Sequence, residues 1–450
     1  MSIKMDKHVI VVGGGMAGLA AASTLASRGF AVTLLEAASQ LGGRARSVAI
    51  EYNSQIIQLD NGQHVMLGAY SETLKLLASI GLQEKDAFLR MPLNLDIRNG
   101  NQTAFKLSTP TFLPAPFDQL VSFLLCKGLS WGERLNVIKF MRQLKKQQLL
   151  LPTNTLTTDA PLQLYLQKNN QSENTIQLLW APLCLAALNT PIQTASSKVF
   201  LNVLRDTFAT KHSANFLLAK HDLSQVFALP IERYLKKNNV VIQLNQRVKN
   251  IKIKNGGYIV ATKNAEIVAS HVIIALSAAH LKDVVSVLPN LDVSTKQAES
   301  FSYQPIYTVY LQYATHATLG SPMLGLSNTL AQWVFDRGIL CGQSGLMAVV
   351  ISAQGKHQQY TQDALALRVA QELRNAFPHL AKPLWHKVIA EKRATFSCDV
   401  NLPRPANLTS YAGLYLAGDY TYADYPATIE GAVRSGITCA DLVCNNKSVI

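Results

Sequence analysis

The sequence predicts an α/β protein in which two domains are interleaved along the chain. Residues 8–35 have the pattern of a buried strand, a helix rich in small residues and a second strand. Apolar runs of strand length return after residue 239 and near residue 414, whereas residues from about 90 to 235 are proline-punctuated and then mainly helical in pattern. Because 450 residues exceed one ordinary core, we expect a first domain of 1–85, 240–285 and 390–450 and a second of 86–239 and 286–389.

The N-terminal strand–helix–strand unit carries the glycine spacing of a dinucleotide-binding turn. Gly13, Gly15 and Gly18 follow the first strand in G-x-G-x-x-G order, and Glu36 ends the second strand. The first glycine allows the tight turn, the second lets the backbone approach a pyrophosphate, and the third lets helix and strand pack closely. The helix N-terminus offers N–H groups and a positive dipole end to the phosphates. Glycines also mark ordinary turns, but here the strands, the helix and the terminal acid agree with one another.

The residues that follow narrow the cofactor to FAD. Leu41-Gly42-Gly43-Arg44 completes an E-x(5)-G-G-R arrangement that resembles the FAD-containing amine oxidase and carotenoid desaturase superfamily. The resemblance implies a Rossmann-like FAD-binding domain with an interleaved α+β substrate domain, and it places Arg44 at the flavin side of the cofactor. Gly29 is expected to end the first helix, as glycine often does.

Three later segments extend the resemblance along the chain. It implies that the loop of residues 60–68 passes the flavin ring and that the backbone of Val248 pairs with adenine. A strand ending in Gly418-Asp419 precedes a helix near Ala427, whose N-terminal dipole would stabilise an anionic reduced flavin. The predicted cofactor-binding residues are Gly13, Gly15, Met16, Ala17, Gly18, Glu36, Ala37, Gly43, Arg44, Gly62, Gln63, Val248, Gly418, Asp419, Thr428 and Ile429. We expect non-covalent FAD, because no Cys or His stands in a known attachment motif, and we predict no metal site.

The remaining elements follow from the period of the apolar residues. Strands alternate in polarity every second residue or are continuously apolar, and helices repeat apolar residues every three or four. Predicted strands include 47–50, 240–244, 247–252, 271–276 and 303–313, and predicted helices include 70–81, 117–150 and 362–377.

Composition limits the class of partner. Lysine and arginine total 42 against 28 acidic residues, an excess of 14 that suits nucleic acid, an anionic membrane or an anionic substrate. No nucleic-acid-binding motif accompanies it, so we expect no nucleic acid. The six cysteines form no C-x-x-C pair, which favours a reducing cytoplasm. Residues 9–26 are uncharged, but their glycines stand in nucleotide-binding register, so we read them neither as a targeting signal nor as a membrane span.

A basic, apolar segment predicts contact with a membrane surface. Residues 111–150 carry six basic and two acidic side chains, and bulky apolar residues such as Phe112, Phe117 and Trp131 lie beside them. This pattern fits a helix lying in the membrane interface, and it fits equally well a surface helix packed on the substrate domain. The first interpretation implies peripheral association with the inner face of the cytoplasmic membrane. No pattern indicates an oligomeric state.

Three segments resemble the bacterial hydroxysqualene dehydroxylases of hopanoid synthesis, a branch of the same superfamily. They are LDNGQHVMLGAYSETLKLL, APLCLAALNTP and LYLAGDYTYADYPATIEGAVRSG. The resemblance implies reductive removal of an allylic hydroxyl from a polyisoprenoid lipid, with electrons from NADPH or NADH. Residues 178–188 are expected to form a core helix or to line the lipid pocket, with Cys184 as a small buried apolar residue.

Loss of a hydroxyl requires a general acid, and His64 is the first candidate. Its ordinary pKa near 6.5 suits proton donation near neutrality, although a histidine that only hydrogen-bonds the flavin or a backbone carbonyl is as plausible. Glu430 is the second candidate, with a helix-capping role as its alternative, and Asp424 and Tyr425 are competitors. Against an amine substrate, Thr428 stands where amine oxidases have a cage tyrosine, and residues 303–313 contain no lysine. Carotenoid-type desaturation and flavin binding without catalysis stay open as alternatives.

Overall fold

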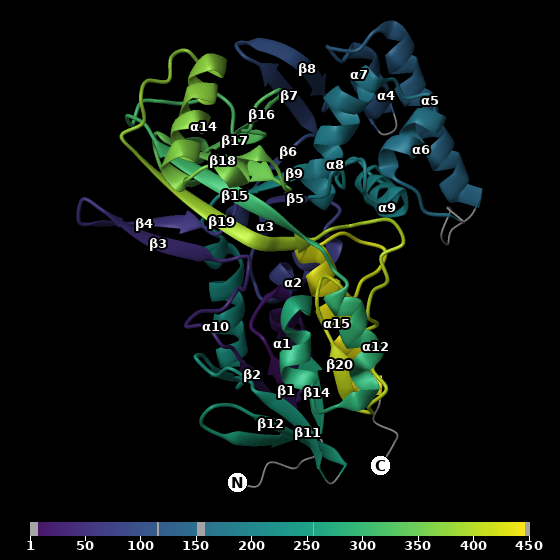
Figure 1. The fold of residues 1–450 in the computed structure, drawn as a ribbon, viewed down its shortest axis with the longest axis vertical. Coiled ribbons are helices and arrows are strands. Elements are labelled where there is room, and N and C mark those ends of the chain that lie inside the picture. Colours follow the sequence, from purple (N-terminus) through teal and green to yellow (C-terminus); the bar gives the residue numbers. More distant parts are fainter. Residues whose placement is uncertain (1–7, 115–116, 151–157, 255, 446–450) are drawn as a thin grey trace.

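The computed structural model describes residues 8–114, 117–150, 158–254 and 256–445, which form two halves, one built on a parallel and one on a mainly antiparallel sheet (Figure 1). The parallel sheet has the order β10-β2-β1-β14-β20 and the larger sheet the order β19-β15-β18-β17-β16-β7-β8. The parallel strands are β1 (His8–Val12), β2 (Ala31–Leu35), β10 (Val241–Gln243), β14 (His271–Ile274) and β20 (Leu414–Leu416). The others are β7 (Asn94–Asn99), β8 (Gln102–Ser108), β15 (Tyr303–Gln312), β16 (Met323–Leu326), β17 (Trp333–Asp336), β18 (Leu346–Ser352) and β19 (Trp385–Phe396).

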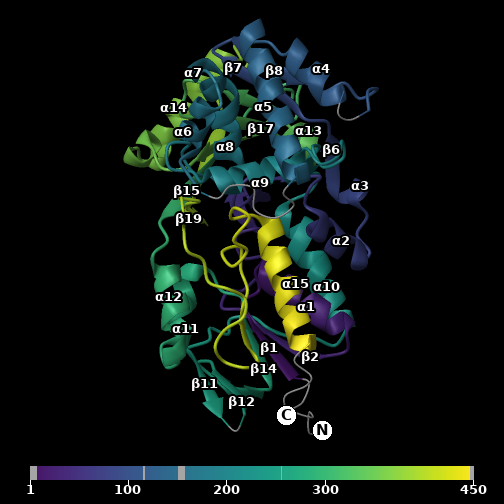
Figure 2. The same cartoon turned by 90° about the vertical axis from the view of Figure 1, so that its right-hand side faces the viewer.

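The parallel sheet is covered on both faces, which explains why its strands are continuously apolar. Val9 and Val11 of β1 face a cluster made with α1 (Met16–Ser27), α10 (Leu229–Lys237) and α15 (Ile429–Asn445). Ile10 and Val12 face the opposite cluster, to which three short strands and two helices contribute (Figure 2). These are β11 (Asn250–Lys254), β12 (Gly257–Ala261), β13 (Glu266–Ala269), α11 (Leu281–Val285) and α12 (Asp292–Glu299). The sequence prediction of a Rossmann-like parallel sheet is confirmed.

The larger sheet carries α14 (Gln362–Ala376) on one face, where Val309 and Val349 pack against Leu365 and Val369. Two small sheets connect the halves: a hairpin of β3 (Ser47–Tyr52) and β4 (Gln55–Asp60), and the group β5 (Val65–Leu67), β9 (Phe216–Ala219) and β6 (Phe88–Met91). The helices between and around them are α2 (Ser71–Ser79), α3 (Glu84–Ala87), α4 (Phe117–Leu125), α5 (Trp131–Leu150), α6 (Leu162–Lys168), α7 (Glu173–Thr175), α8 (Ala181–Leu188), α9 (Ser197–Thr207) and α13 (Arg337–Cys341). Figure 2 shows α4 at the end of the molecule farthest from β11 and β12.

The chain divides between the halves differently from the predicted boundaries in three places. Helix α10, expected in the second domain, packs on α1 because its apolar residues Ile231 and Leu235 join the α1 cluster. Helix α12, also expected there, packs beside α11, since Ala298 and Leu291 belong to the cluster below the parallel sheet. Strand β19 runs past residue 389 to Phe396. The chain therefore passes between the halves at other residues than those at which its composition changes.

The segment predicted as one helix over residues 117–150 is two helices. Helix α4 ends at Leu125 and α5 begins at Trp131, and the backbone of Lys127 pairs with that of Lys106 in β8. No helix within the described ranges combines the length and apolar character needed to cross a bilayer. The six cysteines, all of which are described, are unpaired, and Cys184 is fully buried, as predicted.

Candidate active site

A cavity of about 1090 Å³ lies between the two halves and is lined by residues of both. The predicted residues that line it are Gly13, Gly15, Met16, Ala17, Glu36, Ala37, Gly43, Arg44, Gly62, Gln63, His64, Val248, Gly418, Asp419, Thr428 and Ile429. Gly18 is not among them. A Cβ there would collide with the Gly13 carbonyl oxygen, so Gly18 serves the close packing of helix on strand that its spacing predicts. The structure thus gathers segments that are more than 400 residues apart in the sequence.

The glycine turn presents open backbone to this cavity. Gly15 is the N-cap of α1, and no side chain caps the N–H groups there. A Cβ at Gly15 would meet nothing closer than the Gly43 Cα at 4.0 Å. Glu36 is held at the rim, since its carboxylate accepts hydrogen bonds from the N–H groups of Gly14 (2.6 Å) and Ala38 (2.7 Å). Free N–H groups at a helix start suit a phosphate anion.

Two charged residues that line the cavity form an ion pair. Arg44 donates through Nη2 to Asp419 Oδ2 at 2.7 Å and through Nη1 to the Ala394 carbonyl oxygen at 2.7 Å. The Asp419 carboxylate raises the pKa of Arg44, so this guanidinium stays charged. Both residues line the cavity, and Thr428 Oγ1 accepts the Gly431 N–H at the start of α15. Asp419 is therefore an ion-pair partner of Arg44, a contact that sequence reasoning had not predicted.

The lining fits FAD in two further respects. Val248 makes no backbone hydrogen bond to any described residue, which leaves its N–H and C=O open to an adenine edge. Arg46, missed by the sequence reasoning, also lines the cavity, and its buried Nε has no partner among the described residues. A cation with an unsatisfied donor suits an anionic occupant. The second arginine of the Gly-Gly-Arg-Ala-Arg run was the signal that could have found it.

His64 lines the cavity, but its electrostatic environment differs from the expectation. Burial, and secondarily the nearby Arg44 charge, lower the pKa of His64 to about 4. At pH 7 the imidazole is neutral, so the ordinary pKa near 6.5 no longer supports it as a proton donor. A neutral imidazole that hydrogen-bonds an occupant of the cavity fits this environment better.

This lowered pKa predicts a pH effect on stability. Between pH 6.5 and about 4 the unfolded chain binds a proton at His64 and the folded chain does not, so the free energy of unfolding falls as pH falls through that window. We expect urea unfolding of the FAD-free wild type to show a steeper loss than His64→Gln, which lacks the titrating group. His316→Gln, exposed and far along the chain, serves as control. Parallel curves for wild type and His64→Gln would show that His64 titrates normally.

Glu430, the second acid candidate, is not in the cavity. Its carboxylate is fully buried and accepts from the N–H groups of Glu72 and Thr73, the Thr73 hydroxyl and Arg434 Nε. It therefore caps the start of α2 rather than its own helix, and each carboxylate oxygen already accepts two hydrogen bonds. That prediction was wrong because three of the four hydrogen bonds come from Glu72 and Thr73, which are 358 and 357 residues away in sequence.

The two competitors also lie outside the cavity lining. The Tyr425 hydroxyl donates to Asp206, and burial raises the pKa of Tyr425. Asp424 contributes its backbone carbonyl oxygen to Asn202 at 3.2 Å. Neither side chain reaches the cavity, so neither is a candidate proton donor.

Beyond the polar residues the cavity continues between apolar side chains. Helix α8 contributes Leu183, Ala186, Ala187 and Leu188, so the expectation that residues 178–188 line a pocket is confirmed for its second half. The opposite walls come from the larger sheet and its neighbours, with Leu95, Phe216, Ile306, Met323, Trp333, Phe335 and Val350. An apolar channel open to a redox-cofactor site suits a hydrocarbon substrate.

Comparison with known proteins identifies the same architecture. A family model described as flavin containing amine oxidoreductase matches residues 16–444. The hydroxysqualene dehydroxylase of Rhodopseudomonas palustris is 28% identical over 98% of this chain and 99% of its own, and that of Zymomonas mobilis is 27% identical over 97% and 99%. The crystal structure of an oxidoreductase from Methanosarcina mazei superposes with a TM-score of 0.73 at 15% identity, covering 96% of this chain and 100% of that one.

Proposed function

The chain belongs to the flavin containing amine oxidoreductase family and is an FAD-dependent oxidoreductase. From this premise we propose that it reductively removes the hydroxyl of hydroxysqualene to give squalene, with electrons from NADPH or NADH. The observation that carries the proposal is the apolar channel that continues from the cofactor residues. The full-length relatives named hydroxysqualene dehydroxylase support the same substrate.

In this reaction the protein has to hold the cofactor, orient the lipid and exclude water. FAD, when bound and reduced, would supply a hydride to the allylic cation that remains after the hydroxyl takes up a solvent-derived proton and leaves as water. The glycine turn, Arg44 and Asp419 would hold the cofactor, and the positive end of α15 would face the charge that develops on it. The apolar walls, Trp333 and Phe335 among them, would orient the chain and exclude water from the cation. Oxidative desaturation of a polyisoprenoid is the alternative that the same channel would accept.

One anaerobic assay tests this proposal. Purified enzyme is incubated with hydroxysqualene and NADPH, or with NADH in a parallel sample, and the extracted lipids are analysed. We expect squalene to accumulate in proportion to nicotinamide oxidised, and none to form without enzyme. An enzyme that consumes neither nicotinamide in the presence of hydroxysqualene, or that desaturates phytoene at the expense of an oxidant, would contradict the proposal.

We also propose that the enzyme takes its lipid from a membrane surface through the region around α4. Five large apolar side chains there are 57–83% exposed: Phe112, Phe117, Leu125, Trp131 and Leu135. Helix α4 packs on β8, the neighbour of β7, which gives Leu95 to the channel. Lys127 and Lys139 are exposed beside this apolar surface and suit anionic lipid headgroups.

Arg134 is one of the six basic residues of the predicted membrane-contact segment, but its side chain is held by contacts within the protein. It donates to the carbonyl oxygens of Leu129 and Leu124 and lies over the Trp131 ring at 4.7 Å. It therefore holds the α4–α5 connection, and reversing its charge would disturb the fold as well as the surface.

The membrane proposal predicts a loss of vesicle binding. Charge reversal at Lys127 and Lys139 should weaken binding to anionic vesicles by about 1 kcal/mol per residue, or roughly 30-fold together. Phe117→Ser with Leu125→Ser should weaken binding further and also act on neutral vesicles. Lys252→Glu, exposed in β11 at the opposite end of the molecule, is the control. Co-sedimentation that these variants leave unchanged at low salt would rule out this surface.

A further inference from the structure

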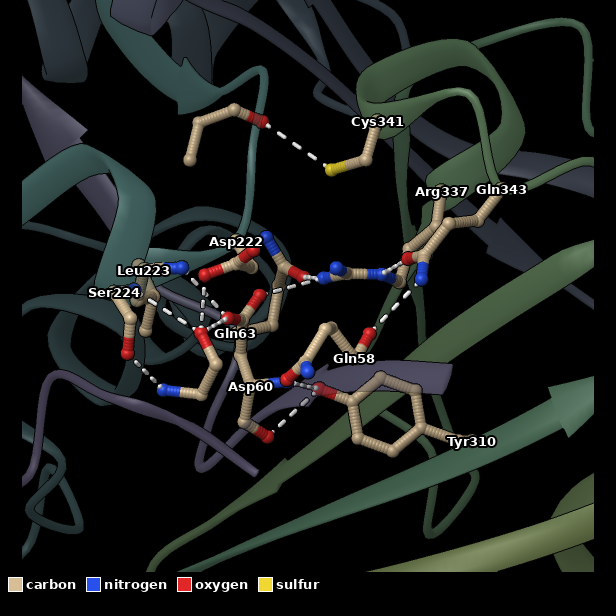
Figure 3. Close-up of polar contacts among 12 residues, drawn as sticks. Gln58, Asp60, Gln63, Asp222, Leu223, Ser224, Tyr310, Arg337, Cys341 and Gln343 are labelled. Atoms are coloured by element: carbon tan, nitrogen blue, oxygen red, sulfur yellow. Dashed lines mark hydrogen bonds and ion pairs between the residues drawn. The ribbon is translucent and has the colours of Figure 1, made fainter. Parts of the chain in front are cut away.

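A buried ion pair lies directly behind the flavin-facing loop. Arg337, at the start of α13, donates through Nη1 to Asp60 Oδ2 at 2.7 Å, and the two side chains are only 1% and 2% exposed. Figure 3 shows the guanidinium directed at the end of β4, where Asp60 stands. Burying such a pair is costly unless its remaining donors and acceptors are satisfied, so the contacts around it are informative.

The contacts around Asp60 fix the base of the loop from several elements (Figure 3). Asp60 Oδ1 accepts from the Leu223 N–H at 2.8 Å and from the Ser47 hydroxyl at 3.3 Å. The Tyr310 hydroxyl of β15 contacts both the N–H and the carbonyl oxygen of Asp60, at 3.1 and 2.9 Å. Asp60, the first residue of the loop, is therefore held through its carboxylate and through its backbone.

Arg337 also reaches the loop itself. Its Nη1 donates to Gln63 Oε1 at 3.0 Å, and its Nε donates to Gln343 Oε1 at 2.5 Å. A guanidinium has donors and no acceptor, so the amide oxygen of Gln63, and not its nitrogen, must face Arg337. The Gln63 NH₂ group is left without a hydrogen-bond partner among the described residues, and Gln63 lines the cavity.

We propose that Arg337 is a positioning residue that turns the Gln63 amide so that its N–H groups donate to acceptor atoms at the edge of the flavin ring. Figure 1 shows β5, which begins two residues after Gln63, near the junction of the halves, and β11, which begins two residues after Val248, at the outer end of the parallel-sheet half. Both residues line the cavity, and with Val248 at the adenine, as the resemblance implies, Gln63 lies toward the flavin end of the cofactor. A donor at that edge stabilises the reduced, more negative flavin over the oxidised form. The inference rests on FAD occupying the cavity and not on the identity of the lipid.

The test is the flavin midpoint potential of the holoenzyme, measured by dithionite titration against a reference dye. Gln63→Met removes the donor and should lower the equilibrium constant for two-electron reduction about tenfold, which is ~30 mV. Gln63→Glu should lower it at least as much, because a carboxylate donates nothing and adds negative charge. Gln371→Met, exposed on α14, is the matched control and should not change the potential.

The role of Arg337 is tested by a double-mutant cycle. Arg337→Lys keeps a positive charge beside Asp60, but its single nitrogen cannot stand at both the Nε and Nη1 positions, from which Arg337 reaches Gln343 and the Asp60–Gln63 pair. It should therefore lower the potential when Gln63 is present and have no further effect on Gln63→Met. If Arg337→Lys does not fold, Gln343→Met removes only the Nε acceptor and should shift the potential in the same direction by less. A potential that Gln63→Met leaves unchanged, or additive effects of the two substitutions, would overturn the proposal. Dithionite supplies the electrons, so a wrong lipid assignment does not alter this result.

Discussion

Gly15→Asp is expected to yield folded protein without FAD. A carboxylate at the Gly15 side-chain position would face the space reserved for the pyrophosphate, and two unit charges about 4 Å apart repel by ~4 kcal/mol at an effective dielectric of 20. That corresponds to roughly a 10³-fold weaker Kd for FAD. The measurement is flavin absorption per chain after purification, together with titration of the FAD-free protein with FAD.

The structure separates this loss from misfolding. A Cβ at Gly15 meets no atom closer than 4.0 Å, so the substitution should leave the secondary structure and the thermal unfolding of the FAD-free protein nearly unchanged. Gly132→Asp is the matched control, because Gly132 in α5 also has open space around its side-chain position and lies far from the cavity lining. Normal flavin content in Gly15→Asp would show that the phosphates do not lie at this turn. Flavin that stays with the acid-precipitated wild-type chain would contradict non-covalent binding.

Sequence patterns predicted those parts of the site that depend on short-range structure. The glycine turn at Gly13 and Gly15, the acid at Glu36 and the Gly418-Asp419 pair after β20 are local patterns, and the structure brings them to one cavity. Strand β1 could be identified because a strand covered on both faces is continuously apolar. The side on which α10 packs could not, since an amphipathic helix does not specify which apolar surface it meets.

Long-range partners decided the roles that sequence reasoning assigned wrongly or missed. The Asp60–Arg337 pair joins residues 277 positions apart, and neither residue stands in a pattern that indicates a charged partner. The pKa of His64 depends on burial and on Arg44, a neighbour that becomes close only in the fold. The sequence was therefore enough to place His64 at the cavity. Its protonation state depends on the groups around it in the folded chain, which the sequence does not reveal.

Glu430→Ala is expected to destabilise the protein by about 3–5 kcal/mol, because it leaves a partly buried guanidinium and several buried donors without their acceptor. The groups that lose their acceptor are the Arg434 guanidinium, two N–H groups at the start of α2 and the Thr73 hydroxyl. Urea unfolding of the holoenzyme measures the loss. Glu232→Ala, which removes an i,i+4 pair with the exposed Lys236 in α10, should cost less than 1 kcal/mol and is the matched control.

The same residue was a candidate proton donor, and a second measurement distinguishes the two roles. Glu430→Gln keeps the shape and one acceptor, so enough protein should fold for stopped-flow kinetics with hydroxysqualene. A capping residue acts on α2 and not on the reacting atoms, so the FAD-bound fraction should reoxidise with substrate at a rate within a few fold of wild type. Loss of a general acid would instead slow that half-reaction by ~10²–10⁴-fold while NADPH still reduced the flavin normally. Such a slow reoxidation in a variant of wild-type stability would show that Glu430 is the proton donor. Its four hydrogen bonds and its position outside the cavity argue against that role.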